Sequence, residues 1–298
     1  MRRSALQRVL DFYVFSNLHI ALCAVAACIA SYMVLGIRFN TDVLMVAGSG
    51  TLSLYCWQRW LGVKQKENPD YPAERHQWNY RNNSLLLVLT ILGAVVAAAC
   101  LYALPAVTWK IVGVAGAVAI VYSAPMIPFN GKLIRLRDVT GVKVFVIALT
   151  WTLVCVWIPF SLVLKSDSSS MAWELNSQAF VWKWSLIFFL AAVALTLPFD
   201  VRDMDFDKGV LRSLPMIFGA RRMTAAAALI VLISGILFWY FESRISGTAW
   251  PSGIWRGYFL WSTIAFAVVL KSNNRSEHYY SFLIDGLLLL LPLALLIS

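Results

Sequence analysis

The stretch Leu197-Pro-Phe-Asp200-Val-Arg-Asp203-Met-Asp205-Phe-Asp207-Lys-Gly209 follows a long apolar segment and holds four of the 15 acidic residues of the chain. On a helix with about 100° per residue, Asp200, Asp203 and Asp207 project from one face, whereas Asp205 points elsewhere. Three converging carboxylates suit Mg²⁺, which usually completes its shell with water and substrate phosphate oxygens. The stretch therefore predicts a Mg²⁺ site for a diphosphate carried on an apolar tail. The alternative interpretation is a solvated loop.

The composition is that of an integral membrane protein. Of the 298 residues, 60% are hydrophobic and 13% are charged, and the mean hydropathy is +0.71, whereas soluble domains are about half apolar and a quarter charged. With about 20 residues per span, the sequence predicts one all-α domain, residues 1–298, in which nine transmembrane helices surround a central cavity open to the cytosolic side. The predicted spans are 16–36, 42–62, 84–104, 107–127, 142–164, 180–199, 223–241, 252–270 and 281–297.

Lys and Arg are divided unequally between the two sides of the membrane. Most of the 25 fall in the N-terminal segment and the even-numbered connections, and short loops rich in these residues stay cytoplasmic. This predicts a cytoplasmic N-terminus, a C-terminus on the opposite side and an aspartate stretch facing the cytosol, in a membrane of the bacterial inner type. The net charge of +10 then reflects topology and anionic lipids, and it indicates no nucleic-acid function. We expect the first apolar run to be retained as a helix, since it lacks the pattern of a cleaved signal.

Polar residues inside the spans are expected to turn toward the cavity or toward one another, because lipid offers no hydrogen bonds. They include Gln58, Arg59, Ser123 and Asp285. For Asp285 the favoured interpretation is a carboxylate near the cytosolic interface, paired with Arg275 or Lys271, and the alternative is an acid that faces the cavity. The five cysteines are predicted to be small apolar packing residues.

The segment Asp200-Val-Arg-Asp203-Met-Asp-Phe-Asp207-Lys-Gly209, with the Ser-Leu-Pro and Gly219 that follow, resembles the second aspartate-rich motif of the UbiA superfamily of intramembrane prenyltransferases. A weaker similarity lies in Tyr122-Ser123-Ala-Pro125 at the end of the fourth span. The resemblance implies a UbiA-like fold and an enzyme that uses Mg²⁺ to move a prenyl group from a prenyl diphosphate to a hydrophobic acceptor, aromatic or lipidic.

The family's first aspartate-rich motif is missing from residues 53–65, where the resemblance would place it. The sequence there has Gln58 and Arg59, and no acid occurs before Glu67. Arg59 either pairs directly with diphosphate oxygens through its planar guanidinium group or extends to the cytosolic surface from a helix end.

The connection after the second span offers other candidates. Glu67, Asp70 and Glu74 are possible displaced ligands, but Pro69 and Pro72 break any helix among them and favour a solvated loop. His76 is a candidate for proton removal, although a single histidine in a loop is more often an ordinary surface residue.

The leading hypothesis is prenyl transfer. In it, Asp200, Asp203 and Asp207 hold Mg²⁺, and Arg59, Lys143, Arg202 and Lys208 contact the diphosphate as its carbon–oxygen bond ionises. Aromatic faces lining an apolar tunnel shield the allylic cation, and the candidates are Tyr55, Trp57, Trp60, Tyr122, Phe145 and Trp151. Two other hypotheses are a UbiA-type terpene cyclase, which needs no acceptor, and a non-catalytic lipid-binding or transport protein with the same scaffold.

Overall fold

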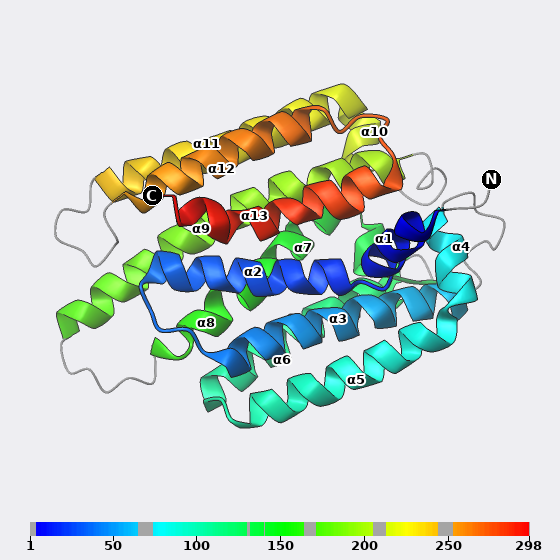
Figure 1. Ribbon diagram of the computed structural model, residues 1–298, viewed down its shortest axis with the longest axis horizontal. Coiled ribbons are helices and arrows are strands. Elements are labelled where there is room, and N and C mark those ends of the chain that lie inside the picture. The colour runs from blue at the N-terminus through cyan, green and yellow to red at the C-terminus, as the bar shows by residue number, and fades with distance from the viewer. Residues whose placement is uncertain are drawn as a thin grey trace.

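The computed structural model describes residues 4–64, 74–129, 132–139, 141–163, 171–204, 213–243 and 253–297. Long helices run side by side along one axis, and α13 lies between α12 and α2 (Figure 1). The helix α1 and the last turn of α13 lie at opposite ends of the bundle (Figure 1). The fold class predicted from the sequence, an all-α polytopic membrane protein, is confirmed.

The elements follow one another in a simple order. The first half contains α1 (Ala5–Phe15), α2 (Leu18–Leu35), α3 (Thr41–Lys64), α4 (Glu74–Arg81), α5 (Asn83–Tyr102) and α6 (Ala106–Ser123). The antiparallel strands β1 (Ile127–Phe129) and β2 (Lys132–Ile134) and the short helix η1 (Leu136–Asp138) come next. The second half contains α7 (Val142–Thr152), η2 (Leu153–Trp157), α8 (Ile158–Phe160), α9 (Met171–Asp203), α10 (Leu214–Phe218), α11 (Ala220–Ser243), α12 (Ile254–Leu270), η4 (Tyr279–Ile284) and α13 (Asp285–Leu295).

Local sequence signals explain where the first helices begin and end. Ser4 caps α1 by accepting a hydrogen bond from the backbone N–H of Gln7, whose side chain accepts one from the N–H of Ser4 in return, a reciprocal capping box. Asn17, with φ of 66°, separates α1 from α2. Gly36, with φ of 64°, ends α2, because this left-handed conformation is easy only for glycine and a few polar residues.

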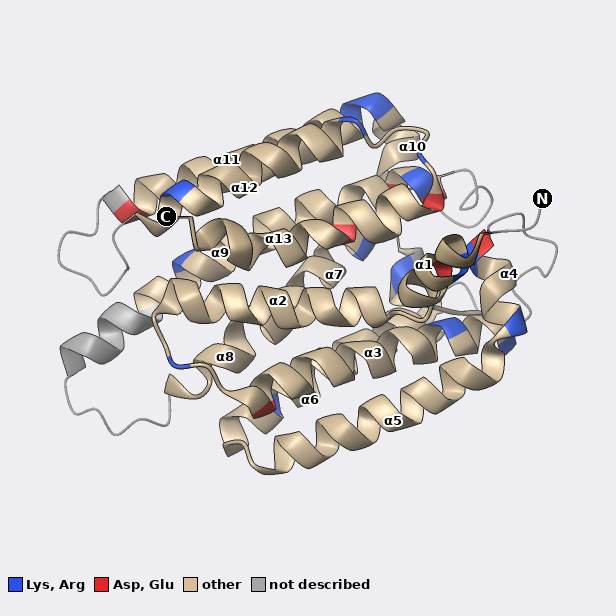
Figure 2. Cartoon of the chain, in the orientation of Figure 1, with Lys and Arg blue, Asp and Glu red and all other residues tan. Residues whose placement is uncertain are grey.

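The helices coincide with the predicted membrane spans. Six are long and apolar enough to cross a membrane: Leu18–Leu35, Asn83–Tyr102, Ala106–Ser123, Val142–Phe160, Ala179–Asp203 and Ala220–Glu242. The shorter apolar helices Ile254–Leu270 and Tyr279–Leu295, together with α3, cover the other three predicted spans. Nine crossings therefore remain a prediction. Charged residues of the described chain gather toward the two ends of the bundle (Figure 2), as a protein that spans a membrane requires.

Small residues and buried hydrogen bonds hold the helices close together. A methyl group at Gly257 of α12 would collide with the backbone carbonyl of Ala294 in α13, so these helices touch backbone to backbone, as small residues allow in membranes. The indole N–H of Trp184 donates to Ser31 Oγ at 2.9 Å. The cysteines are free, and all except Cys100 are buried, in agreement with a packing role.

Two short π-helical turns interrupt the bundle, η2 after α7 and η4 before α13. Each adds a residue to a helical turn, which rotates the side chains that follow relative to a regular helix. Single π-turns of this kind occur often at functional sites. Both adjoin the cavity described next, since Val154 of η2 and Tyr280 of η4 line it.

Candidate functional site

A cavity of about 1090 Å³ lies inside the bundle. It reaches the end of the bundle that holds α4, since Arg75, His76 and Asn79 of that helix line it, and it extends inward to apolar residues such as Phe188 and Leu288. Its charged lining residues are Arg59, Glu74, Arg75, Arg135, Arg137, Lys143, Asp200, Arg202, Asp203, Arg275, Glu277 and Asp285. A space that is ionic at one end and apolar at the other suits an amphipathic ligand.

Asp200 and Asp203 lie on the last turn of α9 and face a common cation. The ammonium nitrogen of Lys143, in the first turn of α7, is 3.2 Å from Asp200 Oδ1 and 3.6 Å from Asp203 Oδ2. Asp200 is almost fully buried, with 5% of its side chain exposed. Carboxylates at the C-terminal end of a helix are opposed by the helix dipole. The pair therefore depends on neighbouring cations.

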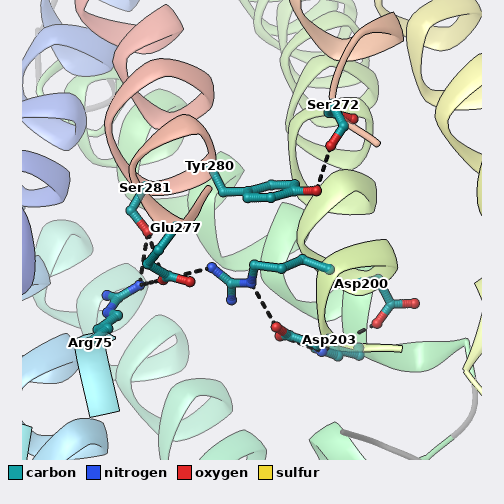
Figure 3. A network of polar contacts seen from close by, with 9 residues as sticks. Arg75, Asp200, Asp203, Ser272, Glu277, Tyr280 and Ser281 are labelled. Atoms are coloured by element: carbon teal, nitrogen blue, oxygen red, sulfur yellow. Dashed lines mark hydrogen bonds and ion pairs between the residues drawn. The ribbon is translucent and has the colours of Figure 1, made fainter. Parts of the chain in front are cut away.

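Arg202 joins these acids to a second part of the chain. Its Nε donates to Asp203 Oδ1 at 2.8 Å, and its Nη1 donates to Glu277 Oε1 at 2.9 Å (Figure 3). Its guanidinium group also lies over the rings of Phe199 and Tyr280, 5.1 and 5.6 Å from their centres. With two carboxylates and two aromatic faces around it, the guanidinium group is held rigidly.

Arg75 approaches Glu277 from the opposite side (Figure 3). Its Nη1 lies 3.6 Å from Glu277 Oε1 and donates to Ser281 Oγ at 3.1 Å. Its Nη2 donates at 3.1 Å to the side-chain oxygen of Asn17, the residue that separates α1 from α2. Segments far apart in the sequence thus meet at one polar network.

The charge state of Glu277 follows from these neighbours. Burial raises the pKa of this carboxyl group, but the positive charges of Arg202, Arg75 and Arg59 lower it by more, so that its pKa lies below the ordinary value of 4.5. Glu277 is therefore ionised at neutral pH. Its contribution to stability is present above the pKa of the unfolded chain and is lost as the pH falls through the lower pKa of the folded protein.

We expect Glu277→Gln to lower the free energy of unfolding by about 1–3 kcal/mol at pH 7, because buried donors of Arg202 and Arg75 lose a charged acceptor. The deficit relative to the unmodified protein should shrink as the pH falls below about 4.5. Thermal unfolding in lipid nanodiscs across this range measures both effects. Asp42→Asn, at the start of α3, is the matched control. A deficit that does not change with pH would contradict the assignment.

Arg59 is the unusual cation of the site. Among the residues that the structure describes, no hydrogen bond or ion pair reaches its guanidinium group, yet it lines the cavity. Arg75 and Arg202 lie within electrostatic range of it. A partly buried charge without a close partner costs free energy, and the guanidinium groups of Arg75 and Arg202 oppose the charge of Arg59, an effect that Glu277 and Asp203 offset only in part. The arrangement is that of an anion site.

Asp200 and Asp203 are the carboxylates of the site that could bind a divalent cation. Within the described ranges, no third His, Cys, Asp or Glu joins Asp200 and Asp203 in a metal-binding group. Mg²⁺ often takes only one or two protein carboxylates and fills the rest of its shell with water and phosphate oxygens. The Lys143 ammonium between the two acids shows that they hold a cation there. These residues therefore fit one Mg²⁺ ion.

Comparison with known proteins finds solved structures with a similar fold and no similar sequence. Neither known protein-family models nor curated proteins match the sequence. A solved UbiA homologue from Archaeoglobus fulgidus bound to GPP and Mg²⁺ matches 97% of this chain and 100% of its own, with a TM-score of 0.64 and 14% sequence identity. The same homologue bound to DMAPP and Mg²⁺ matches 97% and 99%, with a TM-score of 0.61 and 14% identity. A structure of digeranylgeranylglyceryl phosphate synthase in membranes matches 98% of each chain, with a TM-score of 0.55 and 12% identity.

The chain has the UbiA fold. The resemblance inferred from the aspartate-rich stretch is thereby confirmed at the level of the fold. Because the sequence identities are so low, they show the architecture alone, and the chemistry must be argued from the side chains of this chain.

The UbiA fold brings together most of the residues proposed from the sequence. Asp200, Asp203, Arg59, Lys143 and Arg202 all line the one cavity. The helix α9 is described as far as Asp203, so the structure shows the predicted helical face at Asp200 and Asp203, and the part of the prediction that concerns Asp207 is not tested. The others proposed from that stretch, Asp205, Asp207 and Lys208, lie outside the described residues.

Three expectations were wrong. Asp285 lines the cavity and does not pair with Arg275 or Lys271, because η4 and α13 direct it inward. Glu74 and His76 do not lie in a loop, since they belong to the first turn of the helix α4 and line the cavity, although Glu74 is also exposed. The prolines Pro69 and Pro72 lie outside the described residues, and the helix begins at Glu74.

The remaining candidates from the sequence are two acids and six aromatic residues, and only some of the aromatic residues line the cavity. The acids Glu67 and Asp70 lie outside the described residues. Of the aromatic candidates, Tyr55, Tyr122 and Trp151 line the cavity, whereas Trp57, Trp60 and Phe145 do not. Phe145 is half exposed.

Two residues that organise the site, Arg75 and Glu277, were not among those proposed from the sequence. They lie about 200 positions apart, in connections that look like ordinary charged loops. The one available signal was that both fall on the side predicted to be cytosolic, beside the aspartate stretch.

Proposed function

We propose that this protein is a UbiA-type intramembrane prenyltransferase, which takes the prenyl group of a prenyl diphosphate and passes it to a hydrophobic acceptor. The observation that carries the proposal is that Arg59, which has no hydrogen-bond or ion-pair partner among the described residues, lines the same cavity as the buried Asp200 and the partly exposed Asp203. Arg59, with no partner among the described residues, and two acids that already hold the Lys143 ammonium are complementary to a diphosphate that arrives with a metal ion.

The basic residues bind and orient the diphosphate. Arg59 offers a planar fork of N–H donors that matches phosphate oxygens. Lys143 and Arg202 border the same space from α7 and α9, and Glu277 and Asp203 keep Arg202 in position. Asp207 and Lys208 belong to the same proposal from the sequence. These positive charges favour the leaving group as the carbon–oxygen bond breaks.

Asp200 and Asp203 are the residues that would hold Mg²⁺. When bound, this ion supplies positive charge to the diphosphate as it leaves. The solved UbiA homologue contains Mg²⁺ together with GPP or DMAPP, which supports the proposal.

The apolar part of the cavity accommodates the prenyl chain. Tyr55, Tyr122 and Trp151 line it together with Val154 and Phe188. Aromatic faces stabilise a nearby cation through their ring electrons. They also exclude water, which limits hydrolysis of the donor.

A product assay tests the proposal. Purified protein in nanodiscs is incubated with geranyl, farnesyl or geranylgeranyl diphosphate and Mg²⁺, with and without a panel of phenolic and lipid-alcohol acceptors. We expect diphosphate release that requires Mg²⁺, and a prenylated acceptor. A hydrocarbon or cyclic alcohol formed from the donor alone would instead indicate a terpene cyclase. Without diphosphate release from any donor, with Mg²⁺ or with Mn²⁺, catalysis of either kind is excluded.

A further inference from the structure

Asp285 is an acid at membrane depth that the site described above does not use. It follows the π-helical turn η4 directly and lines the cavity. Among the described residues, no hydrogen bond or ion pair reaches its carboxylate. Charged residues inside a membrane protein are costly and tend to be functional.

Hydrogen bonds and packing hold the backbone at Asp285 in place, whereas its carboxylate is not engaged by any described residue. The thiol of Cys23 in α2 donates to the Asp285 carbonyl oxygen at 3.2 Å. The next residue, Gly286, packs against the ring of His19, whose Nε2 lies 3.0 Å from the carbonyl oxygen of Phe282. These contacts fix the direction in which Asp285 points.

Asp285 lies deeper in the cavity than the ionic network. It lies eight positions after Glu277 on one continuous helical segment, which corresponds to about 12 Å along the axis of a regular α-helix. Tyr55, one of the aromatic residues in the apolar part, lies within electrostatic range of Asp285. A diphosphate held by Arg59 and Arg202 would therefore have its reacting carbon on the side toward Asp285.

We propose that Asp285 is the catalytic base that accepts the proton of a hydroxyl-bearing acceptor, either a phenol or a lipid alcohol. The inference rests on the proposed prenyl transfer. The bond between the prenyl carbon and the diphosphate oxygen breaks, and the diphosphate leaves with the electron pair. The acceptor oxygen forms the new bond to that carbon, and its proton passes to the Asp285 carboxylate, which later returns it to water.

Asp285 suits this role because no side chain in the described ranges engages its carboxylate. A carboxylate already bound to a guanidinium group, as Asp203 is, has its lone pairs engaged. Asp285 keeps its lone pairs available for the hydroxyl of an acceptor, which also orients the nucleophile. Glu277 is likewise already paired, with Arg202 and Arg75.

Several groups influence the charge of Asp285, and the pH dependence of kcat/KM must be interpreted with all of them in mind. They come from α2, α3, α4, α9 and the start of the last helical segment, and they are His19, Cys23, Tyr55, Arg59, Arg75, Arg202, Asp203 and Glu277. Only an effect that disappears on substitution of Asp285 itself can be assigned to it.

The test compares Asp285→Asn and Asp285→Glu with the unmodified protein and with Asp42→Asn. Binding is measured with geranyl thiolodiphosphate, an unreactive analogue. Turnover is measured as diphosphate release from geranyl diphosphate with water as the acceptor, and with the phenols of the assay above. For Asp285→Asn we expect a Kd for the analogue within twofold of the unmodified value and a kcat about 100-fold lower, as for loss of a general base.

Further readouts separate this role from a structural one. The pH dependence of kcat/KM should flatten in Asp285→Asn, and Asp285→Glu should restore part of the rate because it keeps a carboxylate. The thermal unfolding midpoint of Asp285→Asn should be unchanged or higher, since an unpaired buried charge is removed. An unchanged kcat, or a Kd for the analogue that weakens in step with kcat/KM, overturns the proposal. An unmodified protein that releases no diphosphate overturns the proposed function itself, and this inference with it.

Discussion

Asp203→Asn is expected to lower the rate of diphosphate release by about 100- to 1000-fold, the range seen when one charge-stabilising group is lost from an active site. Asp203 binds Arg202 through Oδ1 and Lys143 through Oδ2. An amide at this position cannot act as an anionic ligand for Mg²⁺. It also leaves Arg202 with one fewer charged partner. The measurement is a diphosphate-release assay at saturating donor and varied Mg²⁺.

Two controls make this result specific. Glu242→Gln removes a carboxylate at the other end of the bundle, where Glu242 accepts hydrogen bonds from the backbone N–H groups of Gly253 and Trp255, and it should leave the rate unchanged. Asp200→Asn should lower the rate as well, because both acids share the Lys143 cation. If Asp203→Asn stays folded and retains more than half of the rate, the metal role assigned to this acid is wrong.

Arg59→Gln should have effects of opposite sign on binding and on stability. We expect its affinity for inorganic diphosphate to fall about 10- to 100-fold, because a charge-assisted hydrogen bond contributes about 1.5–3 kcal/mol. The thermal unfolding midpoint of the ligand-free protein should rise, since Arg59 has no partner among the described residues and is repelled by Arg75 and Arg202. Calorimetric titration and thermal unfolding in nanodiscs measure the two quantities.

Arg38→Gln is the matched control for this pair of measurements. Arg38 is exposed in the short segment between α2 and α3, away from the cavity, and its loss should change neither quantity. A structural role for Arg59 predicts the reverse of our expectation, a lower unfolding midpoint with little change in affinity. That result would remove the observation that carries the proposed function.

The sequence was informative about the site wherever neighbouring residues act together. Asp200 and Asp203 are three positions apart at the end of an apolar run, so their shared face and their depth follow from helix geometry alone. Lys143 and Arg59 were found in the same way, as cations at the ends of spans. The pairing of Lys143 with both acids was not predictable, because it depends on how α7 packs against α9.

Asp285 shows that the position of a residue along a helix does not by itself predict which way its side chain points or which partner it has. Its position four residues into the last apolar run suggested an interfacial acid with a basic partner nearby in the sequence. The π-helical turn η4 rotates the segment, and no periodicity argument detects an extra residue in one turn. The side chain consequently faces the cavity, with cations from α3, α4 and α9 around it.

By itself, the sequence determined that this is an all-α membrane protein and that an acidic cluster follows a long apolar helix. These properties depend on composition and on the helical repeat, which are local. Only the tertiary structure decided which charges meet: Arg75 and Glu277 join Arg202, while Arg59 and Asp285 have no partner in the part of the chain that the structure describes. Such pairings depend on helix packing between residues far apart in the chain, and side chains separated by 200 positions carry no local signal of their contact.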